Sequence, residues 1–256
     1  MRSKWLRICK KVWCALQNMQ SCVQGDRPVY PVLRQLTSKQ PIVTQIDGLL
    51  TPAECAYLVK TAHGAGFEAS EIEGRGEVRS LRTSRTADLP EDDPVVQCIE
   101  RRLATIAGMP ATSLEPLQAT SYARGERYKT HHDVPRDGGG RGYKRRLKTI
   151  FAYSQADGEL PAGRCGGATC FHRLRGSDGK SLRVYPRAGS AVMWTNYDDM
   201  GRRDTRTEHS GEEVTCPDVV KVGLNAWLHG EERRTAKRSP TPSHERRSRP
   251  RRPKKE

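Results

Sequence analysis

His131, Asp133 and the distant His209 are the residues of this chain whose types and spacing are best suited to chemistry. Residues i and i+2 of a β-strand point to the same side of the sheet, so a His-x-Asp pair on a strand would aim an imidazole and a carboxylate into one cavity. A histidine from a later strand can complete three ligands on one face of a divalent cation. The sequence therefore predicts a metal site whose opposite coordination positions are open, unlike a structural zinc site that four protein ligands close.

Two histidines and one carboxylate are the ligand set expected of non-haem Fe(II) sites that bind a co-substrate and O2. A His-x-Asp pair also occurs by chance on protein surfaces, so its surroundings must decide between the two interpretations. Residues 117–122 have the composition of a strand, Gly125 permits a turn before the pair, and residues 219–228 are rich in β-formers. His132 should face the opposite side of the strand from the first ligand, which argues against it as a ligand.

Several further motifs occur in one order and together resemble the prolyl 4-hydroxylase branch of the Fe(II)/2-oxoglutarate dioxygenases. The resemblance runs from about residue 41 to 229. It comprises Arg82-Thr83-Ser84, Tyr122-x-x-Gly125-x-x-Tyr128-x-x-His131-x-Asp133, Arg146-x-x-Thr149, Gly166-Gly167-x-Thr169-x-Phe171, Pro186-x-x-Gly189-Ser190-Ala191, His209, Lys221 and Trp227. It implies Fe(II), 2-oxoglutarate as co-substrate, O2 and ascorbate, and hydroxylation of a peptidyl proline to 4-hydroxyproline with release of succinate and CO2.

Lys221 is the candidate anchor for the C5 carboxylate of 2-oxoglutarate, because a buried ammonium can form a charge-assisted hydrogen bond with it. The apolar residues around it indicate a buried strand, whereas the alternative is a solvent-facing strand lysine. The resemblance adds Tyr122 and Thr169 as further contacts to the co-substrate.

For the peptide substrate, the resemblance points to Tyr128, Arg146 and Trp227, although Trp227 could equally be a core residue. The chain departs from the family pattern in three places. His209 and Lys221 are separated by two residues more than expected, and Ala168 and His172 replace an acid and a proline in the double-glycine motif.

The elements that must position these residues are two helices followed by many short strands. Thr51-Pro52-Ala53-Glu54 has the form of a capping box with proline at the first helical position, and Asp93-Pro94 opens a second helix in a similar manner. The predicted strands are residues 42–46, 147–153, 168–171, 181–184, 191–194, 206–210 and 219–228. This order predicts a mainly β (α+β) fold, a double-stranded β-helix (jelly-roll) barrel backed by N-terminal helices.

The positive charge of the chain is concentrated at its ends. The formal net charge is +15, of which residues 1–45 and 231–256 carry +7 each. We expect a basic amphipathic segment and linker over residues 1–40, with the linker at 24–40, and a dioxygenase domain over 41–230 whose barrel occupies about 116–229. Residues 231–256 are expected to form a basic disordered tail. Any contact with nucleic acid or an acidic surface should involve these ends.

The sequence does not decide the compartment of the protein or the redox state of its cysteines. Residues 1–25 fit a transit peptide, an interfacial helix or a helix packed on the domain, and no stretch is long and apolar enough to span a bilayer. The resemblance favours the endoplasmic reticulum over the cytosol, nucleus or another organelle. Cys165 and Cys170 could form a disulfide, but two reduced cysteines are favoured. Residues 134–145 are expected to be a mobile loop at the barrel mouth or a tolerated insertion.

Two other functions remain possible from the sequence. The chain could be a related 2-oxoglutarate oxygenase that acts on another side chain or on a nucleic-acid base. It could also be a non-catalytic binding module tethered by its basic tail, although such a module would have no need of these metal ligands.

Overall fold

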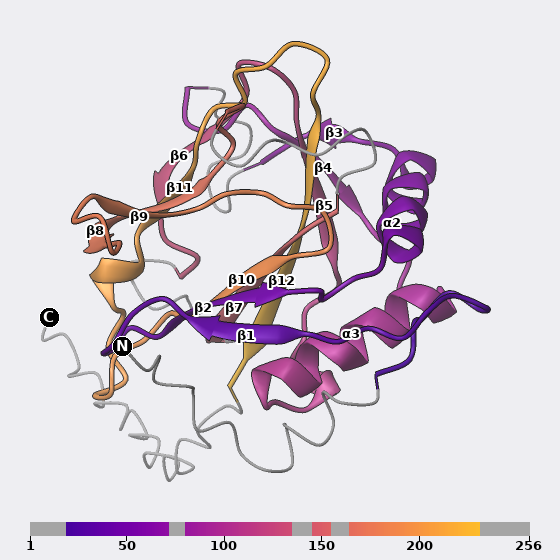
Figure 1. Cartoon of the computed structure of the whole chain (residues 1–256), viewed down its shortest axis with the longest axis horizontal. Coiled ribbons are helices and arrows are strands. Elements are labelled where there is room, and N and C mark those ends of the chain that lie inside the picture. Colours follow the sequence, from indigo (N-terminus) through magenta and orange to yellow (C-terminus); the bar gives the residue numbers. More distant parts are fainter. Residues whose placement is uncertain (1–18, 72–79, 135–144, 155–163, 231–256) are drawn as a thin grey trace, which may run out of the picture.

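Two antiparallel sheets and two helices form the part of the protein that positions the candidate site (Figure 1). The computed structural model describes residues 19–71, 80–134, 145–154 and 164–230. The larger sheet has the strand order β1-β2-β10-β7-β12-β5-β4-β3, and the smaller sheet has the order β6-β11-β8-β9. The predicted double-stranded barrel with helices on one side is confirmed.

The larger sheet consists of β1 (Val32–Gln35), β2 (Val43–Asp47), β3 (Glu68–Ala69), β4 (Arg85–Asp88), β5 (Gln118–Tyr122), β7 (Arg146–Tyr153), β10 (Ala191–Thr195) and β12 (Lys221–His229). The smaller sheet consists of β6 (Tyr128–His131), β8 (Thr169–Arg175), β9 (Ser181–Val184) and β11 (His209–Gly211). Two short 3₁₀ turns, Ala111–Ser113 and Thr205–Thr207, lie before β5 and β11. Among the described residues, no helix has the length and apolar character needed to cross a membrane.

Both helices begin where the sequence predicts. Helix α2 (Pro52–Ala65) has the capping box formed by Thr51 and Glu54, and it ends at Gly66. Helix α3 (Pro94–Ala107) is capped by the Asp93 carboxylate, which accepts hydrogen bonds from two backbone N–H groups, and it ends at Gly108 in the left-handed conformation. These local signals need no tertiary partner, because a cap satisfies the unpaired N–H groups of the first turn itself.

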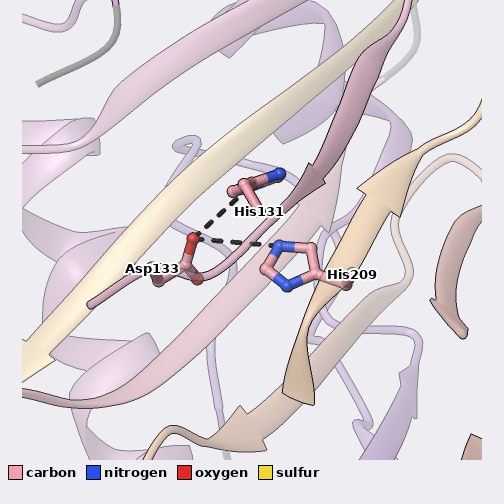
Figure 2. Close-up of side chains that lie close together, drawn as sticks. All are labelled: His131, Asp133 and His209. Atoms are coloured by element: carbon pink, nitrogen blue, oxygen red, sulfur yellow. Dashed lines mark ion pairs between the residues drawn. The ribbon is translucent and has the colours of Figure 1, made fainter. Parts of the chain in front are cut away.

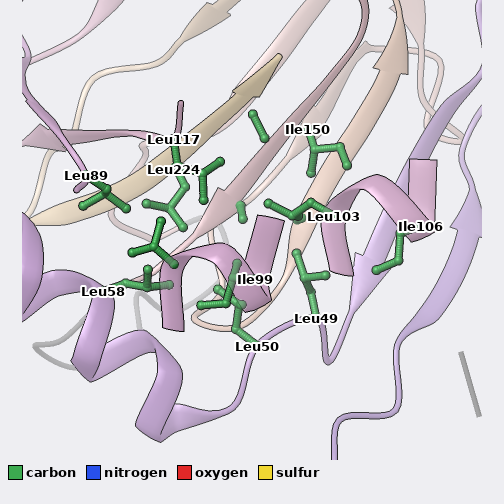
Figure 3. Packing of buried hydrophobic residues seen from close by; sticks show 14 of the residues in the cluster. Leu49, Leu50, Leu58, Leu89, Ile99, Leu103, Ile106, Leu117, Ile150 and Leu224 are labelled. Carbon is green, nitrogen blue, oxygen red and sulfur yellow. The ribbon is translucent and has the colours of Figure 1, made fainter. Parts of the chain in front are cut away.

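Two hydrophobic layers lie on opposite faces of the larger sheet. Between the sheet and the helices, Leu58, Ile99 and Leu103 pack against sheet residues such as Ile150 and Leu224 (Figure 3). A second cluster fills the space between the two sheets and includes the aromatic rings of Tyr153, Phe171 and Trp194. The larger sheet therefore has one face for the helices and one face for the barrel interior.

Strand β12 shows how this alternation places polar side chains inside the barrel. Leu224 and Leu228 belong to the helix-side cluster, whereas Lys221 and Trp227 lie on the other face and line a cavity. Successive side chains of a strand point to opposite faces, so one register fixes both sets. A β-carbon at Gly223, on the interior face, would lie 2.2 Å from the ring of Phe151, so only glycine permits this packing.

Three local predictions are wrong. The predicted linker at residues 24–40 contains β1, which pairs with β2 and buries Leu33. The predicted strand at residues 206–210 is split into a 3₁₀ turn and β11, because the Asp204 carboxylate caps the turn at the Arg206 N–H group. Strand β6 ends at His131, so Asp133 follows the strand instead of lying on it. Three further predictions concern segments outside the described residues. These segments are residues 1–18, residues 135–144 of the predicted loop at 134–145, and the tail at 231–256.

The disulfides also differ from the prediction. Cys165 is bonded to Cys216, and Cys170 is a buried free cysteine. A second disulfide joins Cys22 to Cys98 on α3. Cys165 and Cys170 lie on either side of the double-glycine turn, whereas the loop before β12 brings Cys216 next to Cys165. A partner 51 residues away in the sequence can be identified only from the tertiary structure.

A buried ion pair connects the two helices to the segment that precedes β1. The Arg102 guanidinium donates to both Glu54 carboxylate oxygens at 2.7 and 2.6 Å, and the Cys22 N–H group donates to the same carboxylate. Arg102 also donates to the carbonyls of Leu49 and Gln20. Burial opposes ionisation of Glu54, but these hydrogen bonds outweigh it and lower the pKa of the carboxyl group.

We expect Arg102→Leu to lower the free energy of unfolding by about 3–5 kcal/mol, because it leaves the Glu54 carboxylate buried without its charged partner. Urea denaturation followed by circular dichroism measures this change. The matched control is Arg101→Leu at the exposed neighbouring position, which should shift stability by no more than about 0.5 kcal/mol. Equal stabilities of the two variants would show that the ion pair does not stabilise the fold.

Candidate active site

Two histidines face each other across neighbouring strands of the smaller sheet. His131 on β6 and His209 on β11 are paired in the register of the strands, and their ring centroids are 4.3 Å apart. Asp133 extends toward both rings, as Figure 2 shows, with Oδ1 at 3.6 Å from His131 Nε2 and 3.8 Å from His209 Nε2. One ligand atom from each residue lies within 4.8 Å of the others, so the three can share one metal ion.

The hydrogen bonds of the two histidines direct their Nε2 atoms toward Asp133. His131 Nδ1 lies 2.8 Å from the Lys129 carbonyl, and His209 Nδ1 lies 3.0 Å from the Thr207 carbonyl. A carbonyl oxygen only accepts, so Nδ1 carries a proton in both rings, and Nε2 is the nitrogen that faces Asp133. Burial lowers the pKa of His131 to about 3, which keeps this imidazole neutral.

Asp133 is held by a chain of buried polar side chains. Thr149 on β7 donates to Asp133 Oδ2 at 2.6 Å, and Asn196 donates to the Thr149 hydroxyl at 2.9 Å. The Trp194 indole N–H donates to Asn196 in turn. Burial opposes ionisation of Asp133, but the hydrogen bond from Thr149 and the nearby Arg146 guanidinium favour the carboxylate, and the pKa of this carboxyl group is lowered. The remaining oxygen, Oδ1, is the one that faces both histidines.

His132 does not join the three candidate ligands, and its hydrogen bonds explain why. Its Nδ1 accepts from the Val134 N–H group, so Nε2 carries the proton and donates to the Asp204 carbonyl at 3.0 Å. Both ring nitrogens are therefore engaged by the protein. The ring has the opposite tautomer from its neighbour and supports the loop before β11.

A cavity of about 670 Å³ contains the candidate ligands. All nine site residues named from the sequence line it: Tyr122, Tyr128, His131, Asp133, Arg146, Thr169, His209, Lys221 and Trp227. Exposed acidic side chains, Glu68 and Glu71, also line this cavity. The fold thus brings together residues that are up to 105 positions apart in the chain.

Lys221 is the most unusual charged group of the cavity. Its side chain is 1% exposed, and its ammonium donates to the Gly167 carbonyl at 2.7 Å. No carboxylate pairs with it among the described residues, and burial lowers the pKa of Lys221 to about 7. Buried ammonium groups are costly without an anionic partner, so this end of the cavity fits a ligand carboxylate.

Tyr122 lies beside this lysine, and Thr169 begins the strand that follows the double-glycine turn. Tyr122 is the cross-strand partner of Lys221, whose ammonium lies 4.7 Å from the centre of the tyrosine ring. The Thr169 hydroxyl lies 2.9 Å from the Tyr153 hydroxyl, which donates to the Val184 carbonyl. Both residues line the cavity.

The residues expected to contact substrate form two stacks in the cavity. The Arg146 guanidinium lies 3.9 Å from the Trp227 ring and forms two hydrogen bonds with Glu115, at 2.5 and 2.8 Å. The Tyr128 ring stacks on His131 at 3.5 Å between centroids, and the Arg82 guanidinium lies over the tyrosine ring. Trp227 is therefore a cavity residue on the interior face of β12 and does not belong to the helix-side core.

Several residues that hold the site residues in place were not predicted from the sequence. Thr149 and Arg82 occur within the motifs of the resemblance, so their spacing was a usable signal. Glu115, Asn196 and His229 carried no such signal, because their partners are distant in the sequence. His229 Nε2, for example, lies 2.7 Å from Glu115 Oε1.

Of the departures from the family pattern, Ala168 and His172 do not line the cavity. The longer spacing from His209 to Lys221 forms the loop before β12.

Comparisons with known proteins agree with this arrangement. A family model described as the 2OG-Fe(II) oxygenase superfamily matches residues 117–229. Prolyl 4-hydroxylase 1 of Arabidopsis thaliana is 29% identical over 211 residues, which cover 76% of this chain and 71% of that protein. Human prolyl 4-hydroxylase subunit alpha-1 is 31% identical over 201 residues, 74% of this chain. The matched region is 35% of that subunit, so the chain spans about a third of its length.

The fold has counterparts among solved structures. The viral collagen prolyl hydroxylase of Paramecium Bursaria Chlorella virus-1, in its 2OG complex, matches with a TM-score of 0.57 and 21% identity. The match covers 74% of this chain and 96% of the viral one. At this identity, the likeness shows a shared fold.

Proposed function

Because the chain belongs to the prolyl 4-hydroxylase family of 2OG-Fe(II) oxygenases, we propose that it hydroxylates a peptidyl proline at C4. In this reaction, 2-oxoglutarate and O2 are consumed, succinate and CO2 are released, and one oxygen atom enters the C–H bond. The observation that carries the proposal is the presence, in one cavity, of a buried lysine and three side chains that could hold a metal ion. Ascorbate is the expected reductant for iron oxidised in uncoupled turnovers.

His131, Asp133 and His209 would hold Fe(II) through two neutral imidazoles and one carboxylate. When bound, Fe(II) supplies the positions at which 2-oxoglutarate and O2 meet. Thr149 keeps the second oxygen of Asp133 engaged, so Oδ1 stays directed at the histidines. The donor set fits Fe(II), since nitrogen and oxygen ligands that bind on one face leave the opposite face for substrates.

Lys221 would bind the C5 carboxylate of 2-oxoglutarate, with Tyr122 and Thr169 as further contacts. The Thr169 hydroxyl would turn from Tyr153 to donate to this carboxylate. An ammonium that starts without a carboxylate partner gains one when the co-substrate binds, so the cost of burying its charge is then offset. The aromatic rings around Lys221 exclude water and strengthen this contact.

For the peptide, Tyr128, Arg146 and Trp227 offer aromatic faces and a guanidinium near the metal ligands. A proline ring can pack on an aromatic face, and a guanidinium can donate to a peptide carbonyl. Glu115 fixes the orientation of Arg146 through two hydrogen bonds, so the guanidinium is ordered before any peptide binds.

Mass spectrometry of proline-containing peptides tests the proposal directly. Incubation with the full chain, Fe(II), 2-oxoglutarate and ascorbate should add one oxygen to proline, and Asp133→Ala should not support this addition. The peptide set should include lysine-flanked and glutamate-flanked prolines, because the exposed Glu68 and Glu71 line the cavity. Methylated oligonucleotides serve as the alternative substrate. Consumption of 2-oxoglutarate without any oxygen on proline would assign the enzyme to another substrate class.

A further inference from the structure

Two loops meet at the buried ammonium of Lys221. The double-glycine turn supplies the Gly167 carbonyl that accepts from Lys221 Nζ, at 2.7 Å. The loop between β11 and β12 holds that turn in place, because the Gly167 N–H group donates to the Glu213 carbonyl at 2.9 Å. The position of the Gly167 carbonyl thus depends on how the two loops sit against each other.

The two loops approach so closely that their contact requires glycine. Gly166 has a φ of +66°, and a β-carbon at this position would lie 2.2 Å from the Glu213 carbonyl oxygen. Val214, between these contacts, is fully buried. A small displacement of either loop would therefore be transmitted to the Gly167 carbonyl and to Lys221.

The Cys165–Cys216 disulfide joins these two loops covalently. A backbone hydrogen bond from Thr215 to the Cys165 carbonyl, at 2.9 Å, lies beside it. Cys216 belongs to the segment that makes the spacing from His209 to Lys221 two residues longer than the family pattern, and Asp218 in the same loop adopts a φ of 59°. The longer loop is thus the part of the chain that carries a cysteine to the double-glycine turn.

We propose that Cys165 and Cys216 act as a positioning pair for the co-substrate site, and that reduction of their disulfide weakens 2-oxoglutarate binding. This inference rests on the proposed role of Lys221 as the carboxylate anchor. A dithiol would supply the two electrons and two protons: each cysteine sulfur becomes a thiol, and the dithiol becomes a disulfide. Cys216 is partly exposed, so an attacking thiolate can reach this bond.

Titration of 2-oxoglutarate into the Mn(II)-loaded full chain measures the effect without turnover. The dissociation constant should rise by about fivefold or more in Cys216→Ser and in Cys165→Ser. The rate at saturating 2-oxoglutarate should stay within about twofold, because Cys165 and Cys216 are not among the residues that line the cavity. Equal losses of affinity and saturated rate would overturn the positioning role.

The second disulfide provides a matched control. Cys98→Ser removes the Cys22–Cys98 bond, which joins a helix to the N-terminal segment away from Lys221. It should leave 2-oxoglutarate affinity unchanged. Among the described residues, Cys165–Cys216 is then the disulfide that remains, so the oxidised and reduced forms of Cys98→Ser differ in this bond while both of its cysteines are kept. This comparison holds even if Cys165→Ser and Cys216→Ser fail to fold. Thiol counting and circular dichroism confirm the redox state and the fold.

The outcomes separate this inference from the proposed function. If Lys221→Met binds 2-oxoglutarate as tightly as the wild type, the anchor role itself is wrong. If Lys221→Met binds weakly but the oxidised and reduced forms of Cys98→Ser bind equally, the positioning role of the disulfide is wrong. A loss of affinity in oxidised Cys98→Ser as large as that in Cys216→Ser would also overturn it, because general loosening would then explain both.

Discussion

Asp133→Ala is expected to abolish 2-oxoglutarate turnover, with a fall in rate of at least roughly 1000-fold. Asp133 is the only anionic member of the three candidate ligands, and its loss leaves two neutral imidazoles to hold a dication. Thr149 cannot replace it, because a hydroxyl group carries no charge. Succinate formation measures the activity, and the Fe(II) or Mn(II) content of the purified protein measures the metal site independently.

Asp88→Ala is the matched control for this variant. Asp88 lines the same cavity, but its carboxylate accepts from Gln118 at 3.1 Å and does not belong to the three-residue group. It should retain its metal and its turnover within about threefold, as expected for a residue outside the catalytic group. Wild-type metal content in Asp133→Ala, or loss of metal in both variants, would contradict the assignment of the metal ligands.

Lys221→Met should raise the dissociation constant for 2-oxoglutarate by roughly 30-fold, which corresponds to the loss of about 2 kcal/mol from one charge-assisted hydrogen bond. Methionine fills similar space, so the fold should tolerate the change, and removal of a buried charge can even stabilise it. The control is Lys148→Met. Lys148 is a partly buried lysine whose ammonium donates to the Ala107 carbonyl at 2.6 Å, and it is not among the cavity-lining residues.

Titration of Lys221 should make the binding of 2-oxoglutarate depend on pH. Burial lowers the pKa of Lys221 to about 7 in the free enzyme, and the carboxylate of 2-oxoglutarate would favour the charged ammonium and raise that pKa in the complex. Binding above pH 7 must therefore take up a proton. Affinity should fall by up to about tenfold per pH unit above 7 and level off below it. This dependence should disappear in Lys221→Met, and its persistence there would assign the titration to another group.

Much of the fold was predictable because its signals are local. The caps at Thr51 and Asp93 mark where helices begin, and alternation along β12 places Lys221 and Trp227 on one face once the strand is recognised. Strand β1 was missed because a short edge strand carries little pattern of its own. Its pairing with β2 supplies the stability that its sequence does not show.

The sequence by itself determined the chemistry available to this protein, because residue types fix ligand and charge properties: two histidines, one aspartate and one lysine within recognisable motifs. Only the tertiary structure decided how they converge. Asp133 reaches His131 from beyond the end of β6, and Thr149 and Asn196 hold it there. The Cys165–Cys216 pairing likewise could not be predicted from the sequence. The physical reason is that these contacts join distant segments, whose proximity arises from packing of the whole barrel and not from any local preference of the chain.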